Sequence, residues 1–168
     1  MMEHAAFEPP LSDDQLKDLG RLAVNCGFAE FLLNFHAGMF FHLSGTARMD
    51  LVAPLTTRRK IEIIESRIGK IPKSETRKLV EDALKLISPT IRARNYMLHG
   101  IWGFDGKAPD AKAVVVSPKE DKGHRRAAEI AEHADNLAIA TRMLAEAMVT
   151  DHGHAYSQDP ERLVIELT

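Results

Sequence analysis

Apolar residues recur every three or four positions along most of the chain, the spacing that places them on one face of an α-helix. Four stretches of this kind predict four long helices. They run from Ser12 to about His42, from Thr56 to about Lys70, from Ser74 to His99, and from Lys122 or Gly123 to Val149. The pattern predicts an all-α protein, an up-down helical bundle of four to five helices.

Particular residues mark the expected ends of these helices. Ser12 and Gln15 have the spacing of a capping box, and Ser74 is a suitable N-cap for the third helix. The segment from Ser44 to Pro54 is expected to be a loop. Pro89 is expected to kink the third helix, because proline lacks an amide proton and its ring clashes with the preceding turn.

A small β-hairpin insertion is expected directly after the third helix. Ile101–Phe104 and Ala113–Ser117 can pair around the turn residues Asp105-Gly106 and Pro109-Asp110. The chain then divides into an N-terminal arm (1–11), a helical bundle (12–150) and a polar C-terminal tail (151–168). The tail contains His152 and His154, which make at most half of a metal site, so we expect no metal and no cofactor.

Composition narrows the class of protein. The chain has 168 residues, of which 45% are hydrophobic and 27% charged, enough for the core of one domain. Cys26 is the only cysteine, so no intrachain disulfide can form. The longest uncharged run, from Phe31 to Ala47, contains polar residues and is expected to be a core helix, with no membrane association. The start of the chain does not resemble a signal peptide, and a cytoplasmic location is expected.

Charge is distributed unevenly along the chain. The formal net charge is −2, which argues against a protein that coats nucleic acid indiscriminately. Between Arg58 and Arg94, however, there are eleven basic and five acidic residues, a balance of +6, while the remainder has a balance of −8. This positive stretch is either an ordinary solvated surface or a phosphate-binding surface next to Arg94.

The end of the third helix carries the candidate chemistry. Continuing its apolar stripe from Ile87 and Ile91 reaches Arg94, so a charged residue takes a position that the pattern assigns to an apolar one. A guanidinium cannot lose its charge, and it therefore needs a carboxylate, a phosphate or an open cleft. Asn95 and His99 are four residues apart, so that the amide can orient the imidazole. The candidate substrate-binding residues Arg92, Tyr96 and Trp102 lie near the same helix end.

These residue types suit the cleavage of RNA without a metal. Histidine can move the proton of the 2′-hydroxyl and that of the leaving oxygen, because its unperturbed pKa is about 6.5. Arginine can hold the charge that develops on phosphorus. Since one histidine cannot easily be both acid and base, a symmetric homodimer that brings two copies together is expected.

The segment resembles the R-x(4-6)-H motif of the HEPN domain family. The matching residues are Arg94, Asn95 and His99, followed by Gly100 and the aromatic Trp102. The resemblance implies a bacterial-type helical dimer whose catalytic members cleave RNA with the Arg and His, supported by the polar residue after the Arg. It also implies, for other members, non-catalytic RNA binding or partnership with a cognate antitoxin or nucleotidyltransferase.

The residues of the motif are compatible with three interpretations. The chain is a toxin-type endoribonuclease, a non-catalytic module that binds RNA, a nucleotide or a protein, or a structural helical dimer. In the last of these, Arg94 pairs with a glutamate at the edge of the core. His99 then only caps the end of its helix, where the dipole favours a cation.

Overall fold

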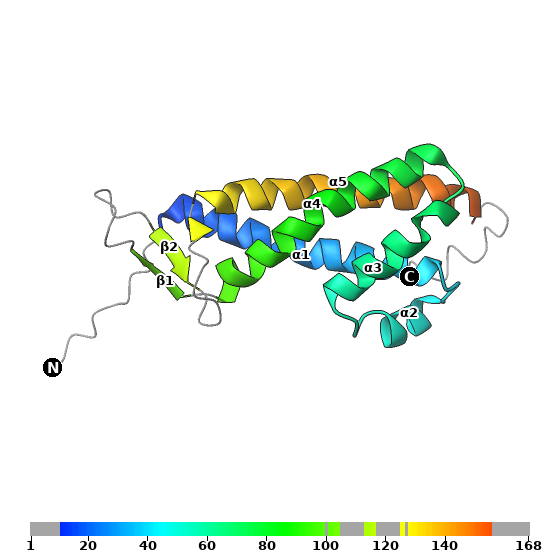
Figure 1. Ribbon diagram of the computed structural model, residues 1–168, viewed down its shortest axis with the longest axis horizontal. Coiled ribbons are helices and arrows are strands. Elements are labelled where there is room, and N and C mark those ends of the chain that lie inside the picture. Colours follow the sequence, from blue (N-terminus) through cyan, green and yellow to red (C-terminus); the bar gives the residue numbers. More distant parts are fainter. Residues whose placement is uncertain (1–10, 100, 105–112, 117–124, 127, 156–168) are drawn as a thin grey trace.

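The computed structural model describes residues 11–99, 101–104, 113–116, 125–126 and 128–155, with side chains for 11–99 and 128–150. Five α-helices make up most of the described chain (Figure 1). They are α1 (Asp13–Met39), α2 (Gly45–Leu51), α3 (Thr57–Arg67), α4 (Ser74–His99) and α5 (Glu129–Ala155). A short 3-10 turn, Ile68–Lys70, follows α3. The all-α prediction is confirmed at the level of a helical bundle.

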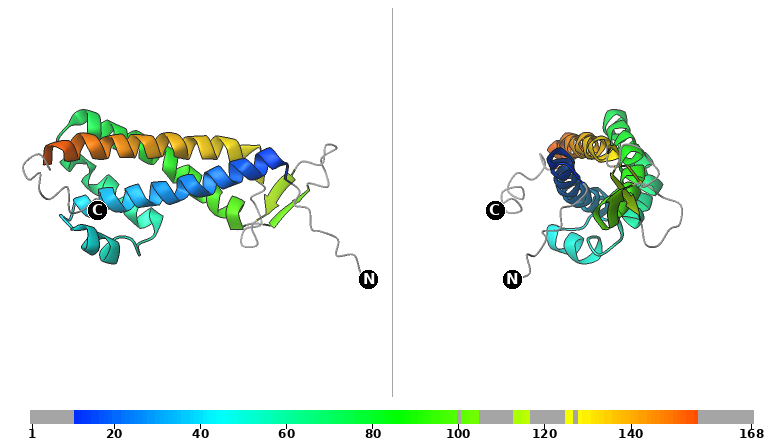
Figure 2. Two further views of the ribbon diagram at one scale, coloured as in Figure 1. Left: turned by 180° about the vertical axis from the view of Figure 1, so that it is seen from behind. Right: turned by 90° about the vertical axis from the view of Figure 1, so that its left-hand side faces the viewer.

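Three long helices lie side by side and form the body of the molecule (Figures 1 and 2). Helices α1 and α5 run parallel, because two contacts between them follow the same order along both helices. Asn25 donates to the carbonyl of Ala134 (3.1 Å), and His36 Nε2 lies 2.9 Å from the carbonyl of Leu144. Helix α4 runs antiparallel to both of these helices. The shorter α3 packs on α1 and α4, so that the C-terminal end of α1 is surrounded by other helices.

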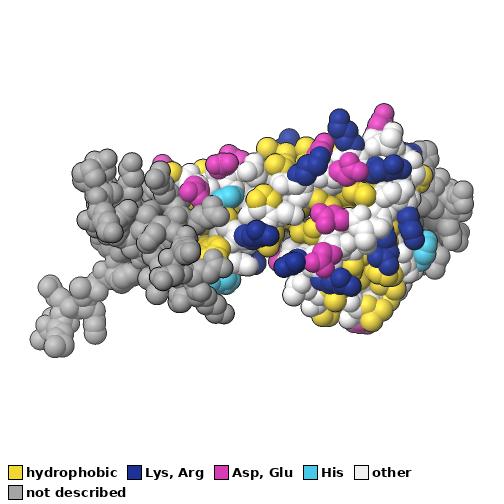
Figure 3. Space-filling model, in the orientation of Figure 1, with side chains coloured by type: hydrophobic (Ala, Val, Ile, Leu, Met, Phe, Trp, Pro, Cys, Tyr) yellow, Lys and Arg dark blue, Asp and Glu magenta, His cyan; other side chains and the backbone are white. Residues whose placement is uncertain are grey.

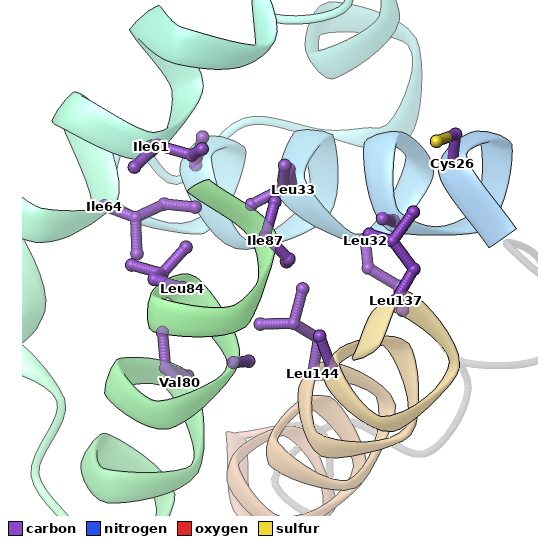
Figure 4. Close-up of a cluster of buried hydrophobic side chains, with 14 of the residues drawn as sticks. Cys26, Leu32, Leu33, Ile61, Ile64, Val80, Leu84, Ile87, Leu137 and Leu144 are labelled. Carbon is purple, nitrogen blue, oxygen red and sulfur yellow. The ribbon is translucent and has the colours of Figure 1, made fainter. Parts of the chain in front are cut away.

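The core lies where these helices meet. Buried side chains from α1, α3, α4 and α5 converge in one cluster, as Figure 4 shows for Leu33, Ile64, Leu84, Ile87 and Leu144. Each of these residues belongs to the three-and-four spacing of its own helix. The apolar periodicity therefore identified the core surfaces of the long helices correctly, except in the C-terminal half of α4.

Two helix starts follow the sequence pattern closely. The Ser12 hydroxyl accepts a hydrogen bond from the amide of Gln15 (3.3 Å), and the Gln15 side chain accepts one from the amide of Ser12 (2.8 Å), which completes the expected capping box. Thr56 caps α3 in a similar way, through the amide of Arg59. Ser74 is the first residue of helix α4 rather than its N-cap, so the helix begins one residue earlier than predicted.

The prediction of a loop from Ser44 to Pro54 is wrong, because this segment contains helix α2. Ser44 caps this helix by accepting from the amide of Ala47 (3.4 Å). None of the seven residues of α2 is buried, so the helix has no apolar stripe by which the sequence could reveal it. Its Arg48 lies across α1, with the guanidinium 4.3 Å from the centre of the Phe35 ring.

The limits of α5 also differ from the expected ones. The helix begins at Glu129 rather than at residue 122 or 123, because Arg125–Arg126 are extended and their backbone pairs with Val114–Val115. It ends at Ala155, six residues beyond Val149. His152 and His154 are therefore on its final turns, and their side chains are outside the described ones.

Short strands follow α4 at the end of the bundle where α1 and α5 begin (Figure 1). Strand β1 (Ile101–Phe104) pairs antiparallel with β2 (Ala113–Val116), and β2 pairs with the two-residue β3 (Arg125–Arg126). The proposed turn residues of the expected hairpin, 105–106 and 109–110, lie outside the described part of the chain.

None of the helices in the described ranges combines the length and the apolar character that crossing a lipid bilayer requires.

Candidate functional site

The candidate site is the C-terminal half of α4, where the pattern of buried residues changes. Up to Ile87 the buried positions are those that the sequence indicates. After Pro89 they are Thr90, Ala93 and Met97, whereas Ile91 is half-buried. The expected continuation from Ile91 to Arg94 and Leu98 is therefore wrong by one position.

Proline gives a physical reason for this shift. Pro89 lies inside the continuous helix and cannot donate to the carbonyl one turn earlier, and such a missing hydrogen bond allows the following turns of a helix to pack differently. Directly after the proline, the hydroxyl of Thr90 donates to the carbonyl of Leu86 (2.8 Å), so this buried hydroxyl has a hydrogen-bond partner within its own helix. Arg94 thus flanks the core instead of entering it.

Three of the predicted site residues share the outer surface of α4. Arg92, Asn95 and His99 are all exposed. They are spaced by three, four and seven residues, so they lie within about 60° of one another around the helix. We call this set the α4 outer face. It presents one guanidinium, one amide and one imidazole to solvent.

Arg94 points in a different direction and has protein partners. It donates from Nη1 to Oδ1 of Asn95 (3.1 Å), and its Nη2 lies 3.9 Å from Oε1 of Glu30 on α1. Its side chain is 25% exposed, and its buried Nε has no hydrogen-bond partner. A guanidinium has five donor hydrogens, so Arg94 retains capacity for a further acceptor.

Glu30 is the centre of a small polar cluster between α1, α3 and α4. Its Oε1 accepts a hydrogen bond from Thr57 Oγ1 (3.0 Å). Lys60, only 4% exposed, donates to the carbonyl of Ala53 (3.1 Å). Burial lowers the pKa of Lys60, and the nearby charge of Glu30 partly offsets this effect. Two cations, Lys60 and Arg94, therefore share one carboxylate.

The sequence contains a signal for Glu30 that lies outside the motif of α4. It is the only charged residue between Arg21 and Arg48. A single carboxylate in such a long uncharged stretch indicates a partner across the bundle, since an isolated charge near a core is costly.

Cys26 lies one turn before Glu30, beneath the same cluster. Its side chain is fully buried, and burial raises the pKa of the thiol to about 11, with Arg94 acting in the opposite direction. The thiol is therefore protonated at neutral pH. Cys26 is a packing residue of the core, as its spacing predicts.

One chain does not bring Arg94 and His99 together. At 100° per residue, a spacing of five places the two side chains about 140° apart around α4. His99 is exposed at the end of the helix, while Arg94 leans toward α1. Tyr96 is half-buried and packs against the core, and Trp102 lies in β1 opposite Val115 with its side chain outside the described ones.

The positive stretch of the sequence does not form a uniformly positive surface. Basic and acidic side chains alternate over the face shown in Figure 3. Arg58 and Arg59 both pair with Glu62, and Lys85 pairs with Asp82. Helical spacing explains this pairing, because oppositely charged residues three or four positions apart are neighbours on a helix surface. Arg92 stands apart from these pairs on the α4 outer face.

A second feature of the described residues that could hold a ligand lies away from the motif. A shallow groove of about 320 Å³ lies at the opposite end of α4 from the motif, between Glu75, Thr76 and Thr150. Within residues 11–99 and 128–150, no three His, Cys, Asp or Glu side chains gather as metal ligands. No protein-family model, curated protein or solved structure matches the chain.

Proposed function

We propose that this chain is a HEPN-like protein that binds RNA through the α4 outer face. The observation that carries the proposal is the exposure of Arg92, Asn95 and His99 together on the last two turns of one helix. The guanidinium suits a phosphate oxygen, and the amide and imidazole suit the sugar hydroxyls and base edges of a single strand. The resemblance of the motif to HEPN domains gives RNA as the ligand class.

The charge of the protein limits this binding to a local contact. With a net charge of −2 and paired charges over α3 and α4, the protein offers few cations for a long stretch of backbone. Each phosphate neutralised by a cation adds to affinity and to its dependence on salt. We therefore expect a short RNA footprint and a small salt dependence.

Metal-independent cleavage of RNA in a dimer is the second candidate function. It is favoured by Arg94, which keeps unused donors beside the α4 outer face. In this reaction His99 takes the proton of the 2′-hydroxyl, and that oxygen attacks phosphorus. The bond to the 5′-oxygen then breaks, and the leaving oxygen is protonated by the His99 of a second chain.

The angle between Arg94 and His99 sets a requirement for this second candidate. Because the two side chains of one helix diverge, Arg94 of one chain must meet His99 of another to hold the same phosphate. The first candidate has no such requirement, since Arg92, Asn95 and His99 already share a surface. The shared exposure of these three residues therefore supports binding by one chain more strongly than cleavage.

One experiment separates the two candidates. Labelled single-stranded RNA is incubated with the protein in excess chelator and divided between a native gel and a denaturing gel. The first candidate predicts a shifted band with intact RNA, and the second predicts cleavage products that end in a cyclic phosphate. The variants are His99→Ala, which should abolish cleavage and weaken binding, and Arg142→Ala on exposed α5 as the matched control. Absence of both shift and products would reject the proposed function.

A further inference from the structure

The outward surface of α1 is apolar where a helix facing water normally carries charge. Between Leu22 and Phe40 only five residues are exposed, and all are apolar or glycine. They are Ala23, Val24, Gly27, Phe28 and Phe31. Val24 is 59% exposed, and Phe28 and Phe31 are each 58% exposed. We call these five residues the α1 outer face. The opposite side of the helix forms the core, and the polar residues Asn25 and Glu30 are half-buried against neighbouring helices. This part of α1 is therefore apolar on both its inner and its outer side, which is typical of a helix that is covered on both sides.

A neighbouring element covers the continuation of this surface. At the C-terminal end of α1, Arg48 of α2 lies over the ring of Phe35 and against Gly38. The same stripe is uncovered from Val24 to Phe31, and α1 runs along the outside of the molecule there, as Figure 2 shows from behind. The uncovered part is thus continuous with a surface that the protein itself packs.

The glycine within this face has no role inside the chain. A β-carbon added at Gly27 would meet nothing within 4 Å. An interior glycine destabilises a helix by about 1 kcal/mol relative to alanine, so the position lacks an explanation from the single chain. A glycine between exposed aromatic rings does let a second helix approach closely.

We propose that the α1 outer face is the contact between two copies of this chain, with the two α1 helices packed antiparallel. A pairing centred between Gly27 and Phe28 places Gly27 opposite the partner's Phe28. It also places Val24 opposite the partner's Phe31. Large side chains then face small ones at every level, as a two-fold contact requires. The interface does not depend on what the α4 outer face binds.

The exposed area sets the expected strength of this contact. Val24, Phe28 and Phe31 leave on the order of 350 Å² of side-chain surface in water, within the size of apolar patches that are functional on monomers. Two copies would bury about 700 Å² from these side chains, and flanking residues would bring the total toward the roughly 1,200 Å² of a small specific interface. We therefore expect a dissociation constant in the micromolar range.

This pairing directs the two α4 outer faces away from each other. Phe28 lies about 200° around α1 from Cys26, which faces Arg94 of α4. The α4 helices are then on the far sides of the dimer, and each binds its own RNA segment. Cleavage at a shared cleft would require a different pairing of chains.

Sedimentation velocity on the full chain tests the interface. At about 100 µM, a contact with a dissociation constant of about 10 µM is mostly occupied. We expect wild type to sediment as a dimer and Phe28→Glu as a monomer. Met49→Glu on α2 is the matched control, because Met49 is also 58% exposed and receives the same charge. It should remain a dimer.

A cross-linking variant supplies an independent readout. Gly27→Cys should form an intermolecular disulfide under mild oxidation, whereas wild type should not, because Cys26 is buried. A wild-type monomer at 100 µM would overturn the proposal, and so would a dimer that Phe28→Glu leaves intact. A monomer that binds phospholipid vesicles through Phe28 would assign the face to a membrane surface instead. Circular dichroism of each variant confirms that it is folded.

Discussion

A single carboxylate links α1, α3 and the candidate site. Glu30 accepts a hydrogen bond from Thr57, and its Oε1 lies 3.9 Å from Nη2 of Arg94. Its charge also offsets part of the lowering of the Lys60 pKa that burial causes. Because Arg94 cannot lose its charge, the carboxylate of Glu30 and the amide oxygen of Asn95 are both favourable partners for its guanidinium. Glu30 therefore competes with any phosphate that approaches Arg94.

Replacement of Glu30 by glutamine should separate stability from binding. Glu30→Gln keeps the shape of the side chain but removes its charge, which leaves Arg94 and Lys60 without their shared anion. We expect the free energy of unfolding to fall by about 1 kcal/mol, a modest loss because the pair is partly exposed. If Arg94 holds a phosphate, as the second candidate function requires, RNA affinity should also rise about two- to fivefold, because a competing carboxylate is removed. Binding through the α4 outer face alone should not change.

Urea denaturation and RNA titration of the same samples check this expectation. Glu62→Gln is the matched control, because Glu62 pairs with two arginines on the surface of α3. It should change stability by less than about 0.5 kcal/mol. Equal effects of the two substitutions on stability and binding would show that Glu30 has no particular influence on Arg94.

Cys26 should make stability depend on alkaline pH. Burial raises the pKa of its thiol to about 11, above the ordinary value near 9. Between these two values the unfolded chain has lost the thiol proton while the folded chain keeps it, so stability falls as pH rises through this range. Below pH 9 both states hold the proton and the effect is absent.

Thermal unfolding of wild type and Cys26→Ala from pH 8 to pH 11 isolates this contribution. The melting temperature of wild type should fall more steeply above pH 9 than that of the variant, even though the variant is less stable at neutral pH because of the cavity it creates. Parallel curves would show that the thiol does not titrate differently in the two states.

At the scale of elements, the sequence predicted the helices whose stability comes from buried stripes. Ser12 and Thr56 mark the starts of α1 and α3 because a side-chain cap is a local interaction between residues three apart. Helix α2 escaped detection because it buries no residue. The extent of α5 was misjudged because the backbone of Arg125–Arg126 pairs with β2, a partner distant in sequence.

The site shows the same division between local and distant effects. The outer positions of Arg92, Asn95 and His99 follow from their spacing on one helix, which the sequence contains. The position of Arg94 does not, because the buried stripe of α4 shifts after Pro89 and Glu30 belongs to another helix. Only the packing of α1 against α4 determines that pairing.

Two glycines of α1 should respond in opposite ways to alanine. Gly20 is exposed with open space around it, so Gly20→Ala should stabilise the protein by about 0.5–1 kcal/mol through helix propensity. A β-carbon at Gly38 would overlap the side chain of Arg48. Gly38→Ala must therefore displace Arg48 from Phe35 and from the Leu43 carbonyl that it contacts, at a cost of about 1–3 kcal/mol.

Chemical denaturation of both variants measures the change in the free energy of unfolding that each substitution causes. The contrast between the positions is informative because the substitution is identical and both are in the same helix. If Gly38→Ala were as stable as Gly20→Ala, Arg48 would not hold α2 against α1 in the way described.

At the scale of the whole molecule, two exposed surfaces have opposite character. The α1 outer face is apolar, and the α4 outer face is polar and includes Arg92, which makes no ion pair with the other described residues. They lie on different sides of the bundle, so one can hold a second chain while the other holds RNA. The face of the molecule shown in Figure 3 mixes side chains of both signs of charge.

The proposed function depends on contact between the α4 outer face and the RNA backbone. The most direct test is the salt dependence of RNA binding, measured by fluorescence anisotropy between 50 and 200 mM salt. Loss of one phosphate contact should reduce the slope of log affinity against log salt by about 0.7 for a single strand. Arg92→Ala should show this reduction together with a three- to tenfold loss of affinity, while the control Arg142→Ala should keep the wild-type slope. Equal slopes for wild type and Arg92→Ala would contradict the proposed contact.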